Sequence, residues 1–182
     1  MFFVESIMIK QKTSFMSFCK KGEQSMNVYC KGVFKEMDLA VDSIIKLINT
    51  LSEEDLKIKP TVGKWSIGEL LSHNSVLCKA DFMIGSGASE DELDRFYEKA
   101  EPEANRKAII DSLISNYSYL KEGISRLRDE ELLQETTSFF GVIHSRYEWL
   151  LDTQAHLFHH RGQLHSMIVH VLKREPNVQL FE

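Results

Sequence analysis

Apolar side chains recur at steps of three and four residues in four separate stretches of this 182-residue chain. Such spacing predicts amphipathic α-helices, because residues three and four apart lie on the same helix face. Three prolines and nine glycines are few for this length, which favours long uninterrupted elements. The chain is therefore expected to be all-α, an up-and-down-type four-helix bundle with a long crossing connection.

Capping signals mark the start of two of these helices. Ser66 stands three residues before Glu69, and Ser145 stands three residues before Glu148. Both pairs have the pattern of a capping box, in which each residue satisfies a free backbone N–H near the other. With the apolar spacing, they place the four helices at residues 27–51, 66–84, 102–128 and 145–175.

The breaks between the helices are expected to be irregular. Pro102 suits the first position of the third helix, and Pro176 is expected to close the fourth. The acidic residues 88–101 predict a long connection that could contain one helical turn at residues 89–97. Residues 129–144 predict a crossing loop, in which residues 136–143 could be briefly extended but are too short for a sheet. Gly162 inside the fourth helix indicates close backbone packing, because glycine there costs about 1 kcal/mol relative to alanine.

Composition excludes several functional classes. The net charge of −5 and the pI of about 5.8 argue against a general nucleic-acid binder, which needs a basic face. No apolar run approaches the length of a membrane span, so no membrane partner is expected. The three cysteines form no C-x-x-C pair, which favours a reducing, cytoplasmic location.

The chain is long enough for one domain with a real core. The bundle pattern begins at about Met26, so the domain is expected to span residues 26–182. Charged residues interrupt the apolar patches of residues 1–25, which leaves no clean signal-peptide core. We interpret residues 1–25 as a weakly structured N-terminal extension that is dispensable for folding.

Five of the seven histidines lie between residues 150 and 171. His156 and His160 are four residues apart and share a helix face, so together they could bind one divalent metal ion. The competing interpretation is a polar helix face with exposed imidazoles. His73 is better placed than His144 as a third ligand, because it shares an inward face with Leu70; alone, it would be a buried, hydrogen-bonded histidine.

Two segments together resemble a known family. They are W-S-I-G-E-L-L-S-H, which ends at His73, and H-L-F-H-H-R-G-Q-L, which begins at His156. They resemble the DinB family, also described as DinB/YfiT-like or bacillithiol-transferase-like, and the resemblance covers nearly the whole chain from Met26. It implies a four-helix bundle, a homodimer, and one divalent metal ion held by His73, His156 and His160.

The resemblance also implies a chemistry. Characterised relatives transfer low-molecular-weight thiols such as bacillithiol, or use mycothiol in isomerisation. Three neutral imidazoles suit Zn²⁺, Ni²⁺, Co²⁺ or Fe²⁺ and leave positions open for a thiol or for water. The expected function is therefore a metal-dependent thiol S-transferase, with a small-molecule thiol and an electrophile as substrates, or a related hydrolase. The alternative is a non-catalytic stress-response or ligand-binding bundle with a structural or adventitious metal.

Four further residues are candidates for catalysis, and each has an ordinary structural alternative. Glu69 could accept the free N–H of His73, or act only as the capping partner of Ser66. Asp152 could support His156 or lie on a solvated face, and His159 could support the site or pack against the helix. Arg161 could bind an anionic substrate or form a structural ion pair. Trp65 and Trp149 are expected to belong to the core.

Overall fold

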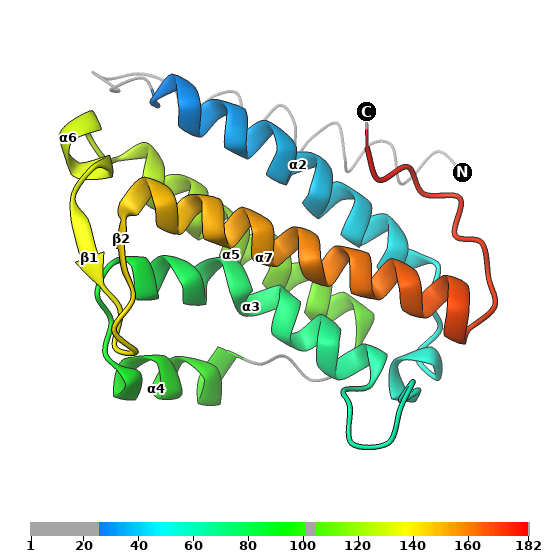
Figure 1. Ribbon diagram of the computed structural model, residues 1–182. Helices are drawn as coiled ribbons and strands as arrows, with labels where there is room; N and C mark the ends of the chain where they lie inside the picture. Colours follow the sequence, from blue (N-terminus) through cyan, green and yellow to red (C-terminus); the bar gives the residue numbers. More distant parts are fainter. Residues whose placement is uncertain (1–25, 101–104, 182) are drawn as a thin grey trace.

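The computed structural model describes residues 26–100 and 105–181 of the chain, so the expected extension at residues 1–25 lies outside the described residues. As predicted, the chain is mainly helical, with four long helices that form a bundle (Figure 1). The long helices are α2 (Val28–Asn49), α3 (Ile67–Gly85), α5 (Arg106–Ser125) and α7 (Arg146–Ser166). The shorter elements are η1 (Asp55–Lys57), α4 (Glu90–Ala100), α6 (Asp129–Leu132), β1 (Glu135–Thr137), β2 (Ile143–Ser145) and the π-helical turn η2 (Met167–Val171).

Each long helix packs against two others. Helix α3 lies between α5 and α7, and α2 closes the bundle by packing against the same two helices. Figure 1 shows α4 running back along the bundle, so that α3 and α5 point in the same direction and α7 is antiparallel to α3. The long crossing connection is therefore the segment that contains α4. Within the described residues, no helix is both long and apolar enough to cross a membrane.

The apolar stripes that predicted the helices form one continuous core. On α2 the three- and four-residue spacing buries Phe34, Met37 and Ile44, each at most 2% exposed. On α7 the apolar stripe includes Leu157 and Leu164, which are both fully buried. Burial of such stripes removes apolar surface from water and supplies the main driving force for the bundle.

The connection predicted at residues 88–101 contains more helix than the single turn expected there, because α4 occupies most of it. Within Glu90–Ala100, Leu93 is the buried residue, so the helix lacks the long apolar stripe that marks the other four. Its start signal is a capping box: Ser89 donates from its backbone N to Glu92 Oε2 at 2.9 Å, and Glu92 N donates back to Ser89 Oγ. A cap can therefore reveal a helix that hydrophobic periodicity misses.

The predicted loop at residues 129–144 is also more ordered than expected. It contains the single turn α6 and an antiparallel hairpin, in which Thr136 of β1 pairs with His144 of β2. Gly141 has φ 88°, a conformation that glycine adopts without strain, and it turns the chain at the hairpin tip. This segment joins α5 to α7 at the same end of the bundle and does not cross it (Figure 1).

Two helix ends differ from the predicted ones. Helix α5 begins at Arg106 with Asn105 as its cap, and Pro102 lies outside the described residues. The last helix ends in the π-helical turn, five residues before Pro176. That turn carries Ile168 into the core at 1% exposure, whereas Val171, which continues the seven-residue spacing of the leucines, is 38% exposed.

After η2, the C-terminal segment folds back along α2 (Figure 1). It is held by a bidentate ion pair, in which the Arg174 guanidinium donates to both Asp55 carboxylate oxygens at 2.6 and 3.0 Å. Those bonds hold the pKa of Asp55 down to about 2, well below its usual range. A second hydrogen bond holds the end of this segment: Arg161 Nη1 donates to the backbone carbonyl of Leu180 at 2.9 Å.

The close packing predicted at Gly162 lies elsewhere. A Cβ at Gly162 would meet no atom within 4 Å, whereas a Cβ at Gly85 would lie 2.8 Å from Trp149 Cβ. A tight contact between helices therefore lies between the end of α3 and the start of α7, and not at Gly162.

This contrast predicts opposite effects of the same substitution. Gly162→Ala should raise the free energy of unfolding by about 0.5–1 kcal/mol, because alanine restricts the unfolded chain and has open space in the helix. Gly85→Ala should lower it by about 1–3 kcal/mol, because Trp149 Cβ is fixed to the backbone of α7 and cannot move aside. Urea denaturation of the two variants measures both changes, and a loss of stability in Gly162→Ala would contradict the observed packing.

Candidate metal centre

The structure brings together three histidines from two antiparallel helices. His73 lies near the start of α3, and His156 and His160 lie in the second half of α7. One ring nitrogen from each lies within 4.8 Å of the others. Their ring centroids are 4.8 to 5.5 Å apart, so the imidazoles surround one common point. Three converging nitrogens of this kind could hold a divalent metal ion.

Hydrogen bonds set the orientation of two of these rings. His156 Nδ1 lies 3.1 Å from Asp81 Oδ2, and His160 Nδ1 lies 2.7 Å from Gln163 Oε1. A carboxylate and an amide oxygen only accept, so each Nδ1 carries the proton and donates. The lone pair of each ring is therefore on Nε2, which is the atom left to bind a metal.

The surroundings of the cluster favour the neutral form of two of its histidines, His73 and His160. Burial lowers the pKa of His73 to about 4, and the neighbouring His160 and His156 act in the same direction. Burial likewise lowers the pKa of His160. His160 Nε2 is buried and has no hydrogen-bond partner among the described residues. A buried lone pair without a partner is costly, and a metal ion is a group that these residues fit.

Trp65 covers one side of the cluster. Its ring centroid lies 5.0 Å from that of His73 and 6.4 Å from that of His160. The expectation that Trp65 is a core residue is wrong, since the side chain is 49% exposed. Trp149 is buried at 7% and does belong to the interior. Trp65 thus shields the imidazoles while it remains accessible to a bound molecule.

Two hollows open beside the cluster. The first has a volume of about 490 Å³ and lies between α3, the hairpin tip and α7. The second has a volume of about 420 Å³ and is lined by Lys64, Trp65 and Gln163, among others. Both volumes lie in the range of small-molecule sites. The first hollow is lined by Asp81, Ile84, Phe140, Trp149, Asp152, Ala155, His156 and His159.

The structure does not bring all four catalytic candidates to the ligands. Glu69 takes the capping role, with a 2.6 Å bond from Ser66 N, and pairs with Lys59. Asp152 lies on an exposed face, 3.8 Å from His144, and lines the first hollow. His159 lines the same hollow, and its ring centroid lies 5.0 Å from that of His160. Arg161 is 3% exposed and contacts Leu180, so it is turned toward the C-terminal segment.

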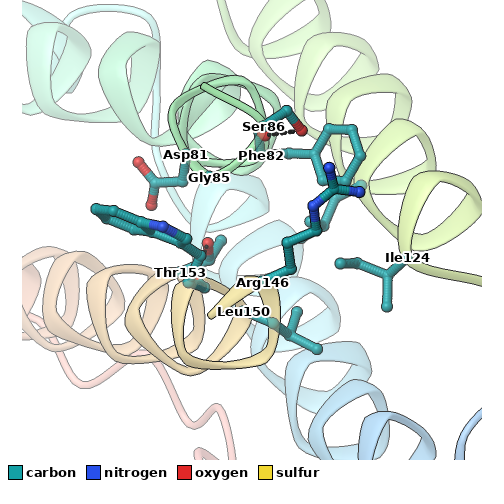
Figure 2. Close-up of a pocket in the computed structure, with 10 residues that line it drawn as sticks. Asp81, Phe82, Gly85, Ser86, Ile124, Arg146, Leu150 and Thr153 are labelled. Carbon is teal, nitrogen blue, oxygen red and sulfur yellow. Dashed lines mark hydrogen bonds between the residues drawn. The ribbon is translucent and has the colours of Figure 1, made fainter. Parts of the chain in front are cut away.

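Sequence reasoning missed the two residues that orient the ligands. Gln163 lies three residues after His160, a spacing that could have pointed to it. Asp81 lies on another helix than its partner His156, so no spacing indicates that contact. Figure 2 shows a narrow hollow between α3, α5 and α7 in which the Arg146 guanidinium extends between α3 and α5 while the Asp81 carboxylate points away from it. The Asp81 carboxylate is therefore available to accept the hydrogen bond from His156 Nδ1.

Together, the fold and the histidine cluster define an all-α bundle protein with a candidate three-histidine metal site. A family model described as the DinB superfamily matches residues 36–164, and the chain belongs to that superfamily. The match includes all three clustered histidines.

Solved structures support the same assignment. The chain is similar to a protein assigned to the DinB family from Exiguobacterium sibiricum 255-15, with 28% identity, a TM-score of 0.75, and coverage of 86% of this chain and 100% of that chain. A DinB-like protein from Bacillus cereus ATCC 10987 has the same fold at 18% identity, with a TM-score of 0.62 and coverage of 84% and 95%. A search of curated proteins found no match.

The ligand set remains a prediction that metal titration tests. Replacing His73, His156 or His160 by Ala should weaken Zn²⁺ binding by more than about 100-fold, because each removes a direct ligand. Replacing His165, which lies outside the cluster, should leave the affinity unchanged. Competition with a chromophoric chelator measures each dissociation constant. Equal binding by wild type and His73→Ala would show that the ligand set is wrong.

Asp81 and Asp152 form a matched pair for the supporting role. Both carboxylates line the first hollow, but Asp81 is the one that accepts a hydrogen bond from a ligand. Asp81→Ala should therefore weaken Zn²⁺ binding by about 10- to 100-fold, and Asp152→Ala by less than about twofold. Similar losses in both variants would point to a general effect of negative charge.

Proposed function

We propose that the chain is a metal-dependent transferase of a low-molecular-weight thiol to an electrophilic substrate. The observation that carries this proposal is the convergence of three imidazoles beside an open hollow. A metal site with three protein ligands keeps a position for an exogenous ligand, which is the arrangement of catalytic rather than structural sites. The resemblance to thiol-transferring relatives supports a thiol as that ligand.

The residues of the chain have distinct tasks in this proposal. His73, His156 and His160 would hold the ion, and Asp81 and Gln163 fix two of the rings. When bound, a divalent ion lowers the pKa of a thiol or of water, which supplies a nucleophile at neutral pH. Trp65 packs against His73, with their ring centroids 5.0 Å apart, and would form one wall of the site.

The reaction exchanges one bond for another and needs no redox partner. The thiol gives its proton to solvent, and its sulfur forms a bond to the electrophilic carbon. The leaving group departs with the electron pair of the bond that breaks. Attack by water on an ester or amide carbon would make the same site a hydrolase, and this is the related activity to measure alongside transfer.

A reconstitution experiment tests the proposal. Protein freed of metal with a chelator and reloaded with Zn²⁺, Ni²⁺, Co²⁺ or Fe²⁺ should alkylate bacillithiol with iodoacetamide at least about 100-fold faster than the metal-free protein. His160→Ala should behave like the metal-free protein, and His165→Ala like wild type. Product formation is measured by mass spectrometry with several thiols.

Two outcomes would overturn the thiol assignment. Metal-dependent hydrolysis without thiol transfer would favour the hydrolase. A metal with no exchangeable position in X-ray absorption spectra, together with no metal-dependent turnover, would favour a non-catalytic bundle.

The homodimer implied by the family resemblance also remains a prediction. Light scattering at micromolar concentration should give twice the monomer mass of 21.0 kDa, and a monomer mass would contradict it.

A further inference from the structure

We propose that the hollow between the hairpin tip and α7 binds the electrophilic substrate, and that it selects an uncharged aromatic or apolar group. This inference rests on the proposed function, because it concerns the second substrate of that reaction. The wall that recognises the group consists of Ile84, Phe140, Trp149 and Ala155.

The hollow reaches the candidate metal ligands directly. His156 is one of its lining residues, and so is Asp81, which accepts the bond from His156 Nδ1. A molecule seated against Phe140 and Trp149 therefore has one end at the aromatic wall and the other beside the cluster. This is the arrangement in which a nucleophile at the cluster can reach a carbon held in the hollow.

Phe140 is the residue that most clearly points to a ligand. Its side chain is 55% exposed, yet it sits edge-to-face against Trp149 with ring centroids 6.3 Å apart. An aromatic ring that is half in water and half against another ring offers a free face to a planar or apolar group. Aromatic side chains in such a position commonly line small-molecule sites.

The hairpin turn presents Phe140 in a fixed place. Ser138 is 4% exposed, and its backbone N and carbonyl bond to Val142 O and Gly141 N, each at 2.9 Å. Ser138 Oγ also accepts a bond from Val142 N at 3.0 Å. These bonds close the turn around residues 139 and 140. Because the turn is preformed, little further ordering is needed when a ligand binds.

The side-chain charges around the hollow disfavour anionic substrates. Its described lining residues include two carboxylates, Asp81 and Asp152, and no Lys or Arg. A negatively charged group in contact with the wall would be repelled by these carboxylates and would find no cationic side chain in the lining to pair with. An uncharged group meets no such penalty and gains from contact with the apolar wall.

Three electrophiles with the same leaving group separate these effects. Iodoacetamide is small and neutral, iodoacetate is small and anionic, and N-benzyliodoacetamide carries an aromatic ring. In each case the thiol sulfur bonds to the CH₂ carbon, iodide departs with the electron pair, and the proton goes to solvent. For metal-loaded wild type, kcat/KM should rise in the order iodoacetate, iodoacetamide, N-benzyliodoacetamide, with about tenfold or more between the first and the last.

Phe140 and its neighbour Phe139 give matched variants. Phe139 is 45% exposed on the same turn, but it does not line the hollow. Phe140→Ala should raise KM for N-benzyliodoacetamide about five- to tenfold and leave KM for iodoacetamide unchanged. Phe139→Leu, which keeps an apolar side chain beside Phe140, should change neither value by more than about twofold. Equal effects of the two variants, or a preference for iodoacetate in wild type, would overturn the inference.

Binding without chemistry separates this inference from the proposed function. N-benzylacetamide lacks the leaving group, and its binding to metal-loaded or metal-free protein is followed by ligand-observed NMR. Binding that Phe140→Ala removes and Phe139→Leu retains would support the hollow even if no thiol is transferred. If thiol transfer proceeds but N-benzylacetamide binds equally to wild type and Phe140→Ala, the inference about the hollow is wrong. The proposed function would not be affected by that result.

Discussion

The site depends on the convergence of three imidazoles, each with a ring nitrogen within 4.8 Å of the others. Imidazole nitrogens in water have hydrogen-bond partners, and His160 Nε2 has lost them without finding another among the described residues. Leaving a buried acceptor unpaired costs about 1–3 kcal/mol. The rest of the structure must supply that energy and hold the rings, and it does so through two helices that the whole core fixes.

The antiparallel packing of α3 and α7 is what makes the convergence possible. It sets the start of α3, with His73, beside the second half of α7, with His156 and His160. At the other end of the same interface, Gly85 lets α3 approach the Cβ of Trp149 closely. Near His73, the capping box of Ser66 and Glu69 fixes the first turn of α3. The close approach at Gly85 therefore sets the spacing of α3 and α7 at one end, and the capping box sets the backbone of the turn that precedes His73.

Periodicity in the sequence was sufficient to predict the bundle and the faces of its long helices, because those helices bury apolar stripes. It failed for α4, which buries Leu93 and is otherwise polar, and for the hairpin, whose strands are only three residues each. The three histidines could be predicted from the i,i+4 pair and the family resemblance. Asp81 could not be assigned to His156 from sequence, because that contact depends on the rotation of α3 against α7, which spacing alone does not fix.

Neighbouring residues of the H-H-R-G-Q segment show why a matching motif is not a list of catalytic groups. His160 faces α3 and the other imidazoles, whereas the next residue, about 100° further round the helix, is Arg161. Its guanidinium bonds to Leu180 O and lies over the rings of Phe158 and Phe181. One helical turn thus serves the site on one face and anchors the C-terminal segment on another. Both tasks need a specific side chain, so the motif combines a chemical requirement with a structural one, and geometry is needed to tell them apart.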